Sequence, residues 1–292
     1  MGIEYDIAEL LIRLRSQGVS FDKVLTLGRQ GYTCSAKGTR ALFAKYGLEC
    51  TWVPPNPYPQ NYSDGLFTAL GATVTESLDI TSAEKATIIH DLNEPVPAAL
   101  HNHFDIVLDA GTLEHVFNIP QAFSNCMRMV RVGGKLIIHT VANNYMGHGF
   151  YQFSPELFFN LLSTQNGFKT ESVLVVEHSP RHRKFEAIAP EDAKSRFETT
   201  TFWRTDLICV ATKLAEATFR IPQQSDYAGN FTLVAGHKPW QFHKPSRYER
   251  FIVEHFPRLT TALKAIKFSA LRPSLRLGNR AAFKRQRGGY SS

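Results

Sequence analysis

The sequence is poor in the features that mark several large classes of protein. Its 292 residues include four cysteines, widely spaced and without a CxxC pair, so neither a disulfide framework nor a zinc site is expected. It has no run of about 18 uncharged apolar residues, and its acidic first residues lack the basic-then-apolar form of a secretory signal. We therefore expect a globular protein of the cytoplasm, with no transmembrane helix and no metal site.

The usual glycine-rich nucleotide motifs are missing as well. The loop at residues 28–31 contains neither GxxxxGK[ST], which cradles phosphates, nor GxGxxG, which marks dinucleotide-binding folds. A nicotinamide-dependent oxidoreductase needs such a loop and usually a Tyr-Lys pair or a similar hydride-transfer constellation, and the chain offers neither. That class remains a rival hypothesis that the sequence disfavours.

Excess positive charge is confined to the end of the chain. Residues 244–292 carry 12 Lys or Arg against 2 Glu, a net charge of +10 in a chain whose total is +7, which leaves −3 for the remainder. A basic tail indicates an acidic partner, such as a membrane surface in weak contact, a nucleic acid or a phosphorylated substrate, although solvated disorder is the more frequent explanation. We expect residues 215–292 to form a basic extension whose last part, residues 272–292, is disordered.

The strongest positive signal is a β-α-β unit at residues 104–141. A short apolar run ends at Asp109, Ala110 and Gly111; apolar residues then recur at helical spacing, with Pro120 marking a break, and a second apolar run follows Gly133 and Gly134. Parallel strands joined by a helix imply an open α/β sheet, whose ligands bind beyond the carboxyl ends of the strands. Residues 109–115 are therefore expected at the mouth of a site.

This unit, FDIVLDAGTLEHV followed by VRVGGKLIIHT, resembles the fourth and fifth strands of class I S-adenosylmethionine-dependent methyltransferases of type 11. The resemblance extends over residues 20–214. It implies a Rossmann-like α/β fold with seven strands, mostly parallel with an antiparallel last strand, and helices on both faces. It also implies methyl transfer from S-adenosylmethionine. A packing helix is expected within residues 1–19.

Two strand ends carry the acids that this resemblance assigns to the cofactor. A strand at residues 72–78 ends at Asp79, whose carboxylate can accept hydrogen bonds from both ribose hydroxyls, with Ile80 beside it. The alternative for Asp79 is a cap for the turn that follows. Asp91 and Leu92 match the positions that meet the adenine amino group and ring. Asp109 and Ala110 complete this set at the fourth strand.

The first glycine loop departs from the family pattern. Members of the family usually carry an acid two residues before the glycine and a second glycine two residues after it, where this chain has Thr26 and Gln30. Gly28 and Gln30 are still expected to contact the cofactor, with Arg29 covering its carboxylate. The alternatives are that Arg29 points to solvent and that the domain is a non-catalytic binding module.

An insertion separates this loop from Asp79. The two are fifty-one residues apart, where the family commonly has about twenty, and residues 50–71 are rich in proline and aromatic side chains. Such a segment beside a site is either a lid or substrate wall or a surface embellishment. The sequence also suggests a short strand at residues 50–53.

Three histidines near the expected mouth are candidates for removing a proton from an acceptor. His148, between two glycines, is the preferred base and His115 the second, because histidine titrates near neutrality. His139 lies within an apolar strand and is interpreted as a satisfied core residue. Each of the first two could instead have a structural role, His115 by hydrogen-bonding backbone and His148 by a hydrogen bond within its turn.

Polar side chains after the fifth strand suggest a small or carbohydrate-like acceptor, methylated on oxygen or nitrogen. Asn143, Asn144 and Tyr151 are the predicted acceptor contacts, and each could equally satisfy loop backbone. The Asn/Asp-Pro-Pro-Tyr/Phe motif of nucleic-acid methyltransferases is missing after the fourth strand, so a specific nucleic-acid partner is not expected.

Overall fold

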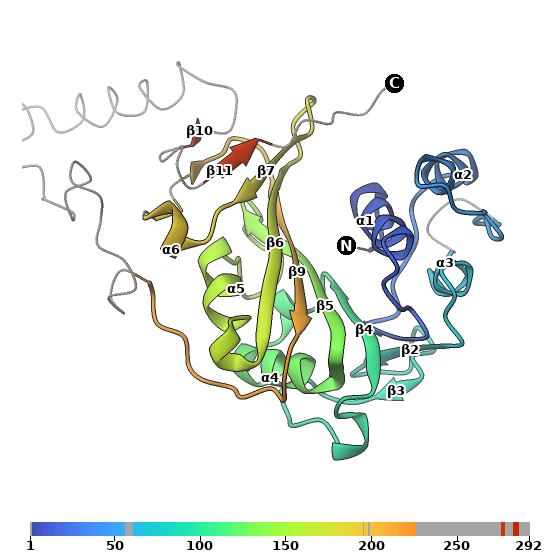
Figure 1. The fold of residues 1–292 in the computed structure, drawn as a ribbon, viewed down its shortest axis with the longest axis horizontal. Helices are drawn as coiled ribbons and strands as arrows, with labels where there is room; N and C mark the ends of the chain where they lie inside the picture. Colours follow the sequence, from blue (N-terminus) through green and yellow to red (C-terminus); the bar gives the residue numbers. More distant parts are fainter. Residues whose placement is uncertain are drawn as a thin grey trace, which may run out of the picture.

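The computed structural model describes residues 2–55, 61–194, 196–197, 199–225, 276–277 and 283–285. Its centre is a nine-stranded sheet in the order β11-β7-β6-β9-β5-β4-β1-β2-β3 (Figure 1). The main strands are β1 Lys23–Leu27, β2 Val74–Asp79, β3 Ile88–Ile89, β4 Phe104–Ala110, β5 Val130–Asn143, β6 Phe168–Glu177 and β9 Thr205–Lys213.

The pairing of these seven strands confirms the predicted fold class. Strands β1 to β5 run parallel to their neighbours, and β9 lies antiparallel between β5 and β6. This is the Rossmann-like methyltransferase arrangement, in which the last of the seven main strands is inserted antiparallel beside the parallel ones. The β-α-β unit predicted from the sequence lies at its centre.

Helices cover both faces of the sheet (Figure 1). On one face lie α4 Ile119–Met129 and α5 Pro155–Leu161, and on the other lie α1 Tyr5–Ser16, α2 Ala36–Lys45 and α3 Asp64–Ala69. Each face has its own buried apolar cluster, because strands covered on both sides carry apolar residues toward both. The predicted helix break is confirmed: Leu113–His115 forms a separate 3-10 turn, and Pro120 lies in the first turn of α4.

The sheet extends beyond the seven predicted strands. Strand β7, Arg183–Ala187, forms a hairpin with β6, and β11, Phe283–Arg285, pairs with its outer edge. A second sheet pairs β8, Thr199–Thr200, with β10, Arg276–Leu277. The short strands β10 and β11 lie within residues 272–292, so the prediction of disorder is wrong at these residues.

Ion pairs hold the basic segment at residues 180–184, which the sequence alone would suggest is a solvated turn. Arg183 Nε lies 2.9 Å from the buried Glu177, while His182 and Lys184 contact the two carboxylate oxygens of Asp6 at 2.7 and 2.8 Å. Burial on its own would raise the pKa of Asp6, but these two partners lower it to about 2. The hairpin is thereby fastened to α1.

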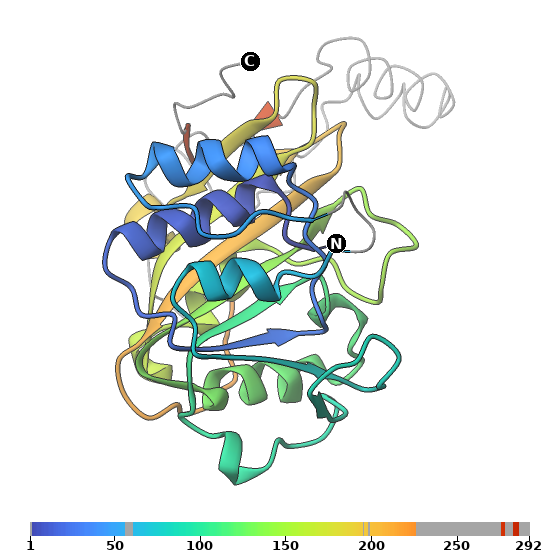
Figure 2. The same ribbon diagram turned by 90° about the vertical axis from the view of Figure 1, so that its right-hand side faces the viewer.

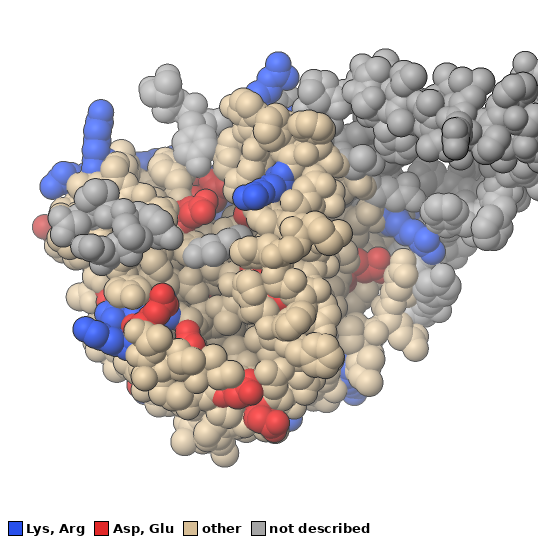
Figure 3. All heavy atoms as spheres, turned by 180° about the vertical axis from the view of Figure 1, so that it is seen from behind, with Lys and Arg blue, Asp and Glu red and all other residues tan. Residues whose placement is uncertain are grey.

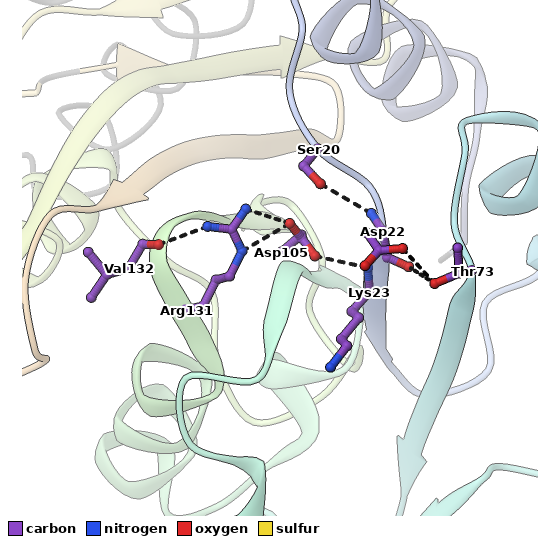
Figure 4. A network of polar contacts seen from close by, with 7 residues as sticks. All are labelled: Ser20, Asp22, Lys23, Thr73, Asp105, Arg131 and Val132. Carbon is purple, nitrogen blue, oxygen red and sulfur yellow. Dashed lines mark hydrogen bonds and ion pairs between the residues drawn. The ribbon is translucent and has the colours of Figure 1, made fainter.

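A polar network closes the end of the sheet opposite the mouth (Figure 4). Asp105 accepts hydrogen bonds from Arg131 Nη2 at 2.6 Å and from the backbone N–H of Lys23 at 2.9 Å, while Thr73 Oγ1 donates to Asp22. These contacts join the amino ends of β1, β2, β4 and β5. They fix the relative positions of the strands whose other ends form the site.

Some predictions fall outside the described residues or were wrong. No strand forms at residues 50–53; instead Trp52 packs edge-on against Tyr32, at 5.3 Å between ring centroids. A helix suggested by apolar residues at positions 259–266 lies outside the described residues, and the predicted domain boundaries stay predictions. None of the described helices has the length and apolar character needed to cross a bilayer.

Candidate active site

The carboxyl ends of the parallel strands open on one side of the molecule. In Figure 2 the blue arrow of β1 points to the right of the view, and Figure 3 shows the molecule from that side. The surface there is hollowed near its centre, and most of its described part is neither acidic nor basic (Figure 3). This is the edge at which open α/β sheets bind ligands.

Gly28 lies where three predicted site elements meet. Its φ is +69°, and a Cβ added there would be 3.2 Å from Thr112 Oγ1, 3.5 Å from Gln30 Nε2 and 3.8 Å from Asp79 Oδ2. A side chain at this position would therefore enter the space between β1, β2 and β4. The glycine keeps this part of the mouth open and holds a left-handed conformation that other residues adopt with strain.

Gln30 is buried beside Gly28, and its predicted contact with the cofactor stays a prediction. Its side chain is 6% exposed, and its amide nitrogen donates to the carbonyl of Leu27 at the end of β1. The backbone around it pairs with the insertion, because the N–H of Ser63 donates to the carbonyl of Gln30 at 3.0 Å. The divergent loop is thus used to dock residues 61–70, and Gln30 can meet a ligand only beside Gly28.

Arg29 is held by contacts within the protein, so its guanidinium is neither directed freely to solvent nor left unpaired for the carboxylate of a cofactor. Its guanidinium stacks on the ring of Tyr62 at 4.0 Å, lies 3.4 Å from Asp64 and donates to the carbonyl of Glu84 at 3.3 Å. It therefore connects the insertion to the loop after β2. This arrangement places Tyr62 and Asp64 of the insertion beside the glycine loop, and a role for the insertion as a lid or substrate wall stays a prediction.

Asp79 caps the turn after β2, and its predicted contact with the ribose stays a prediction. Its Oδ1 accepts the N–H of Thr81 at 3.0 Å, as a turn cap does, while Oδ2 is directed toward Gly28. Ile80, next to it, is 62% exposed. One carboxylate oxygen at the end of β2 is thus aimed into the mouth, where it can accept from a ribose hydroxyl.

Asp91 and Leu92, the residues predicted to meet adenine, follow β3, the strand next to β2 in the sheet. Asp91 Oδ1 accepts from the backbone and side chain of Asn93 at 2.9 and 2.7 Å, and these hydrogen bonds lower the pKa of Asp91. Leu92 is buried in the apolar cluster of its face. The lowered pKa keeps the Asp91 carboxylate ionised at neutral pH, where it can accept a hydrogen bond from an amino group.

Asp109 and Ala110 are buried, which limits the role predicted for them. Asp109 is fully buried and accepts the N–H groups of Thr112 and Leu113 at 2.9 and 3.3 Å, so it shapes the turn after β4. Burial and the nearby charge of Glu114 raise the pKa of Asp109 well above its usual value. In this structure, Thr112 faces Gly28 in place of these two side chains.

His148 and His115 come together with Glu114 at the mouth. His148 Nε2 lies 3.4 Å from Glu114 Oε1, and the rings of the two histidines have centroids 5.0 Å apart. The Glu114 side chain is fully buried, His148 is 36% exposed and His115 is exposed. The sequence predicted both histidines here but did not single out the acid between strand and histidine.

The loop carrying His148 is fastened to the backbone of Glu114. The N–H groups of Phe150 and Tyr151 donate to its carbonyl at 2.7 and 3.2 Å, and a Cβ added to Gly149 would lie 2.6 Å from that carbonyl oxygen. Thr140 Oγ1 donates to Glu114 Oε2 at 2.9 Å. Contacts between the turn after β4 and the loop after β5 therefore position Glu114 and His148 relative to each other.

The predicted acceptor contacts mainly hold this loop. The side-chain nitrogens of Asn143 and Asn144 donate to Thr201 Oγ1 at 2.8 and 2.9 Å, and Tyr151 Oη donates to the carbonyl of Phe117 at 2.7 Å. The structural role that the sequence left open is therefore realised for these atoms. The structure brings all three residues beside the mouth, on the loop that carries His148.

His139 is a buried, hydrogen-bonded residue, as predicted. Its Nε2 lies 3.0 Å from Asp206 Oδ2, which His178 Nε2 also contacts at 2.6 Å. Burial alone would raise the pKa of Asp206, but the two imidazoles lower it below its usual range; the hydrogen bond to Asp206 raises the pKa of His178. Asp206 was not singled out from the sequence, because nothing along the chain shows that β9 starts beside β5.

Residues 72–138 match the model of the methyltransferase domain family. The chain is similar to this family over these residues, which run from β2 into β5 and include Asp79, Asp91 and Glu114. The methyl donor of such methyltransferases is S-adenosylmethionine. A search of curated proteins found none that matches.

Solved structures that match the chain share little of its sequence. A putative methyltransferase from Bacillus halodurans is 12% identical, with 72% of this chain and 100% of that chain aligned at a TM-score of 0.38. A possible histamine N-methyltransferase from Thermotoga maritima is 13% identical, with coverages of 72% and 90% and a TM-score of 0.36. A Burkholderia thailandensis N1-methyltransferase with S-adenosylhomocysteine is 12% identical, with coverages of 71% and 80% and a TM-score of 0.33.

Proposed function

We propose that the methyltransferase transfers the methyl group of S-adenosylmethionine to an oxygen or nitrogen of a small or carbohydrate-like acceptor. The observation that carries this proposal is the meeting of Glu114, His115 and His148 at the mouth, next to the strand ends assigned to the cofactor. In the transfer, the bond from sulfur to methyl breaks as the bond to the acceptor forms, and the acceptor loses a proton. Holding the reacting atoms in line supplies much of the acceleration.

The residues around this cluster support a small acceptor with polar and apolar parts. Phe117 and Phe150 are 72% and 67% exposed, and their rings pack edge-on with centroids 5.9 Å apart. Each lies two residues beyond one of the histidines. We propose that they cover the apolar face of the acceptor, that Asn143, Asn144 and Tyr151 border its polar side, and that His115 and His148 face the reacting atom.

The remaining roles in the cofactor site follow the strand ends. We propose that Asp79 binds the ribose, with Ile80 against the nucleoside, and that Asp91 and the backbone of Leu92 meet the adenine. Gly28 and Gln30 border the methionine portion, and Asp109 and Ala110 shape the turn below it. A cytoplasmic location and weak membrane contact stay predictions.

Incubation with methyl-labelled S-adenosylmethionine and a panel of small hydroxyl and amine compounds tests the proposal. We expect label to enter at least one acceptor, and His148→Asn to lower the rate by about 100-fold or more, the usual contribution of a group that assists proton removal. His101→Asn, at the opposite end of β4, is the control and should leave the rate unchanged. Cofactor binding without transfer to any acceptor would instead support the non-catalytic binding domain.

A further inference from the structure

The cluster of Glu114, His115 and His148 has the composition of a metal site. Each side chain offers one ligand atom, and the three atoms lie within 4.8 Å of one another, the one such group of three found among the residues that the structure describes. One carboxylate with two imidazoles is a ligand set suited to divalent transition metals such as Zn²⁺ and Fe²⁺. The sequence did not predict this, because the two histidines lie thirty-three residues apart in the chain and meet only in the fold.

Two of the three ligand atoms are buried without a hydrogen bond. Within the described part of the chain, neither Glu114 Oε1 nor His148 Nε2 has a hydrogen-bond partner, although the side chain of Glu114 is fully buried. They lie 3.4 Å apart, close enough for an ion pair but not oriented for a hydrogen bond. A buried carboxylate oxygen left unsatisfied costs free energy, which a bound cation would remove.

The surroundings orient the ligands as in known metal sites, where second contacts fix the first. Thr140 holds Oε2 of Glu114 at 2.9 Å and so directs Oε1 toward His148, and the backbone of Glu114 holds the His148 loop through Phe150. Exposed His115 lies on the open side. Ligand atoms bound about 2.1 Å from one metal lie about 3.0–3.4 Å apart. The three atoms lie within 4.8 Å of one another, so a cation would draw them together by less than about 2 Å.

We propose that Glu114 Oε1, one ring nitrogen of His115 and His148 Nε2 bind one divalent first-row transition-metal ion, with its remaining positions facing the mouth. Imidazole ligands favour such an ion over Mg²⁺ or Ca²⁺. His148 would then act as a ligand in place of the general base expected from the sequence. The consequence for catalysis rests on the proposed function: an acceptor hydroxyl bound to the ion would lose its proton more readily. Binding of the ion itself does not rest on it.

Titration of the tag-free full chain with Co²⁺, followed by visible absorption, and with Zn²⁺, followed by calorimetry, tests the proposal. We expect one equivalent to bind tightly, and Glu114→Gln and His115→Asn each to weaken binding at least tenfold. His115 is exposed, so its replacement tests the site even if Glu114→Gln unfolds the protein, which circular dichroism would report. His101→Asn is the matched control and should bind as the parent does, and excess Mg²⁺ should not compete.

Two results would overturn the metal site. One is the absence of stoichiometric binding of either ion by the folded protein. The other is binding that His115→Asn leaves unchanged, which would place the ion on other histidines of the chain. Both readouts are independent of S-adenosylmethionine, so a failed metal site is distinguishable from a failed methyl transfer.

Discussion

Replacing Asp206 with alanine is expected to lower the free energy of unfolding by about 3–5 kcal/mol, the usual cost of removing one partner from a buried charged pair. Asp206 is 2% exposed and its Oδ2 contacts His139 and His178. Alanine would leave both imidazoles without this partner and open a cavity between β5, β6 and β9. Urea denaturation at pH 6 measures the change, and Glu49→Ala, at an exposed acid, should change it by less than about 0.5 kcal/mol.

The pH dependence of this difference follows from the two pKa shifts. The lowered pKa of Asp206 contributes stability that is present above the unfolded value, near 3.9, and is lost as pH falls. The raised pKa of His178 contributes stability that is present below the unfolded value, near 6.5, and is lost as pH rises through the folded value. The effect of Asp206→Ala should therefore be largest between about pH 4 and 6.5. A difference that is constant from pH 3 to pH 9 would show that cavity formation dominates.

Replacing Gly149 with alanine is expected to cost about 1–3 kcal/mol of stability and to displace His148. The residue has a φ of +72°, and its Cβ would lie 2.6 Å from the carbonyl oxygen and 3.1 Å from Cγ of Glu114. The carbonyl group of Glu114 belongs to the backbone and cannot move aside as a flexible side chain can. The loop that carries Gly149 must therefore move away from Glu114. Thermal unfolding measures the stability, and a large fall in methyl transfer should accompany it.

Gly147 provides the matched control for this variant. Its φ is +85°, but a Cβ there would have nothing within 4 Å. Gly147→Ala therefore carries the cost of the left-handed conformation alone, about 1 kcal/mol, and leaves the contact between the loop and Glu114 intact. Equal losses in the two variants would mean that the close approach to Glu114 does not position the loop.

The arrangement of the sheet was predictable because local sequence patterns mark its strands. Residues 106–108 form an uninterrupted apolar run, as a strand covered on both faces requires, and Pro120 marks where the following helix begins. The helix ends at Met129, before the glycines at 133 and 134 that the sequence suggested as its stop. Asp79 and Asp91 could be proposed because Asp79 ends one strand and Asp91 lies two residues after another. The edge strand β7 was missed, since its charged residues suggest a turn until their partners Asp6 and Glu177 are known.

The site itself depends on contacts between distant parts of the chain, which local patterns do not record. The sequence predicts Gln30 as a cofactor contact, and only the structure shows that it is buried where the insertion docks. An acid in a turn is usually exposed, yet the side chain of Glu114 is fully buried beneath the His148 loop. The adjacent His115 was the available signal: an acid and a histidine side by side at a strand end are worth considering as one group.

Calorimetric titration of the full chain with S-adenosylhomocysteine tests the central claim most directly, with Asp79→Ala, Asp79→Asn and the exposed Asp192→Ala titrated alongside. We expect one molecule to bind the parent, and Asp79→Ala to weaken binding by about 1–3 kcal/mol, the cost of leaving hydrogen-bond partners unpaired. Asp79→Asn keeps an oxygen for the N–H of Thr81 and should lose less, while Asp192→Ala should bind as the parent does. Failure of the folded parent to bind would mean that Arg29, Gln30 and the docked insertion close the mouth, and would contradict the assignment of this edge as a cofactor site.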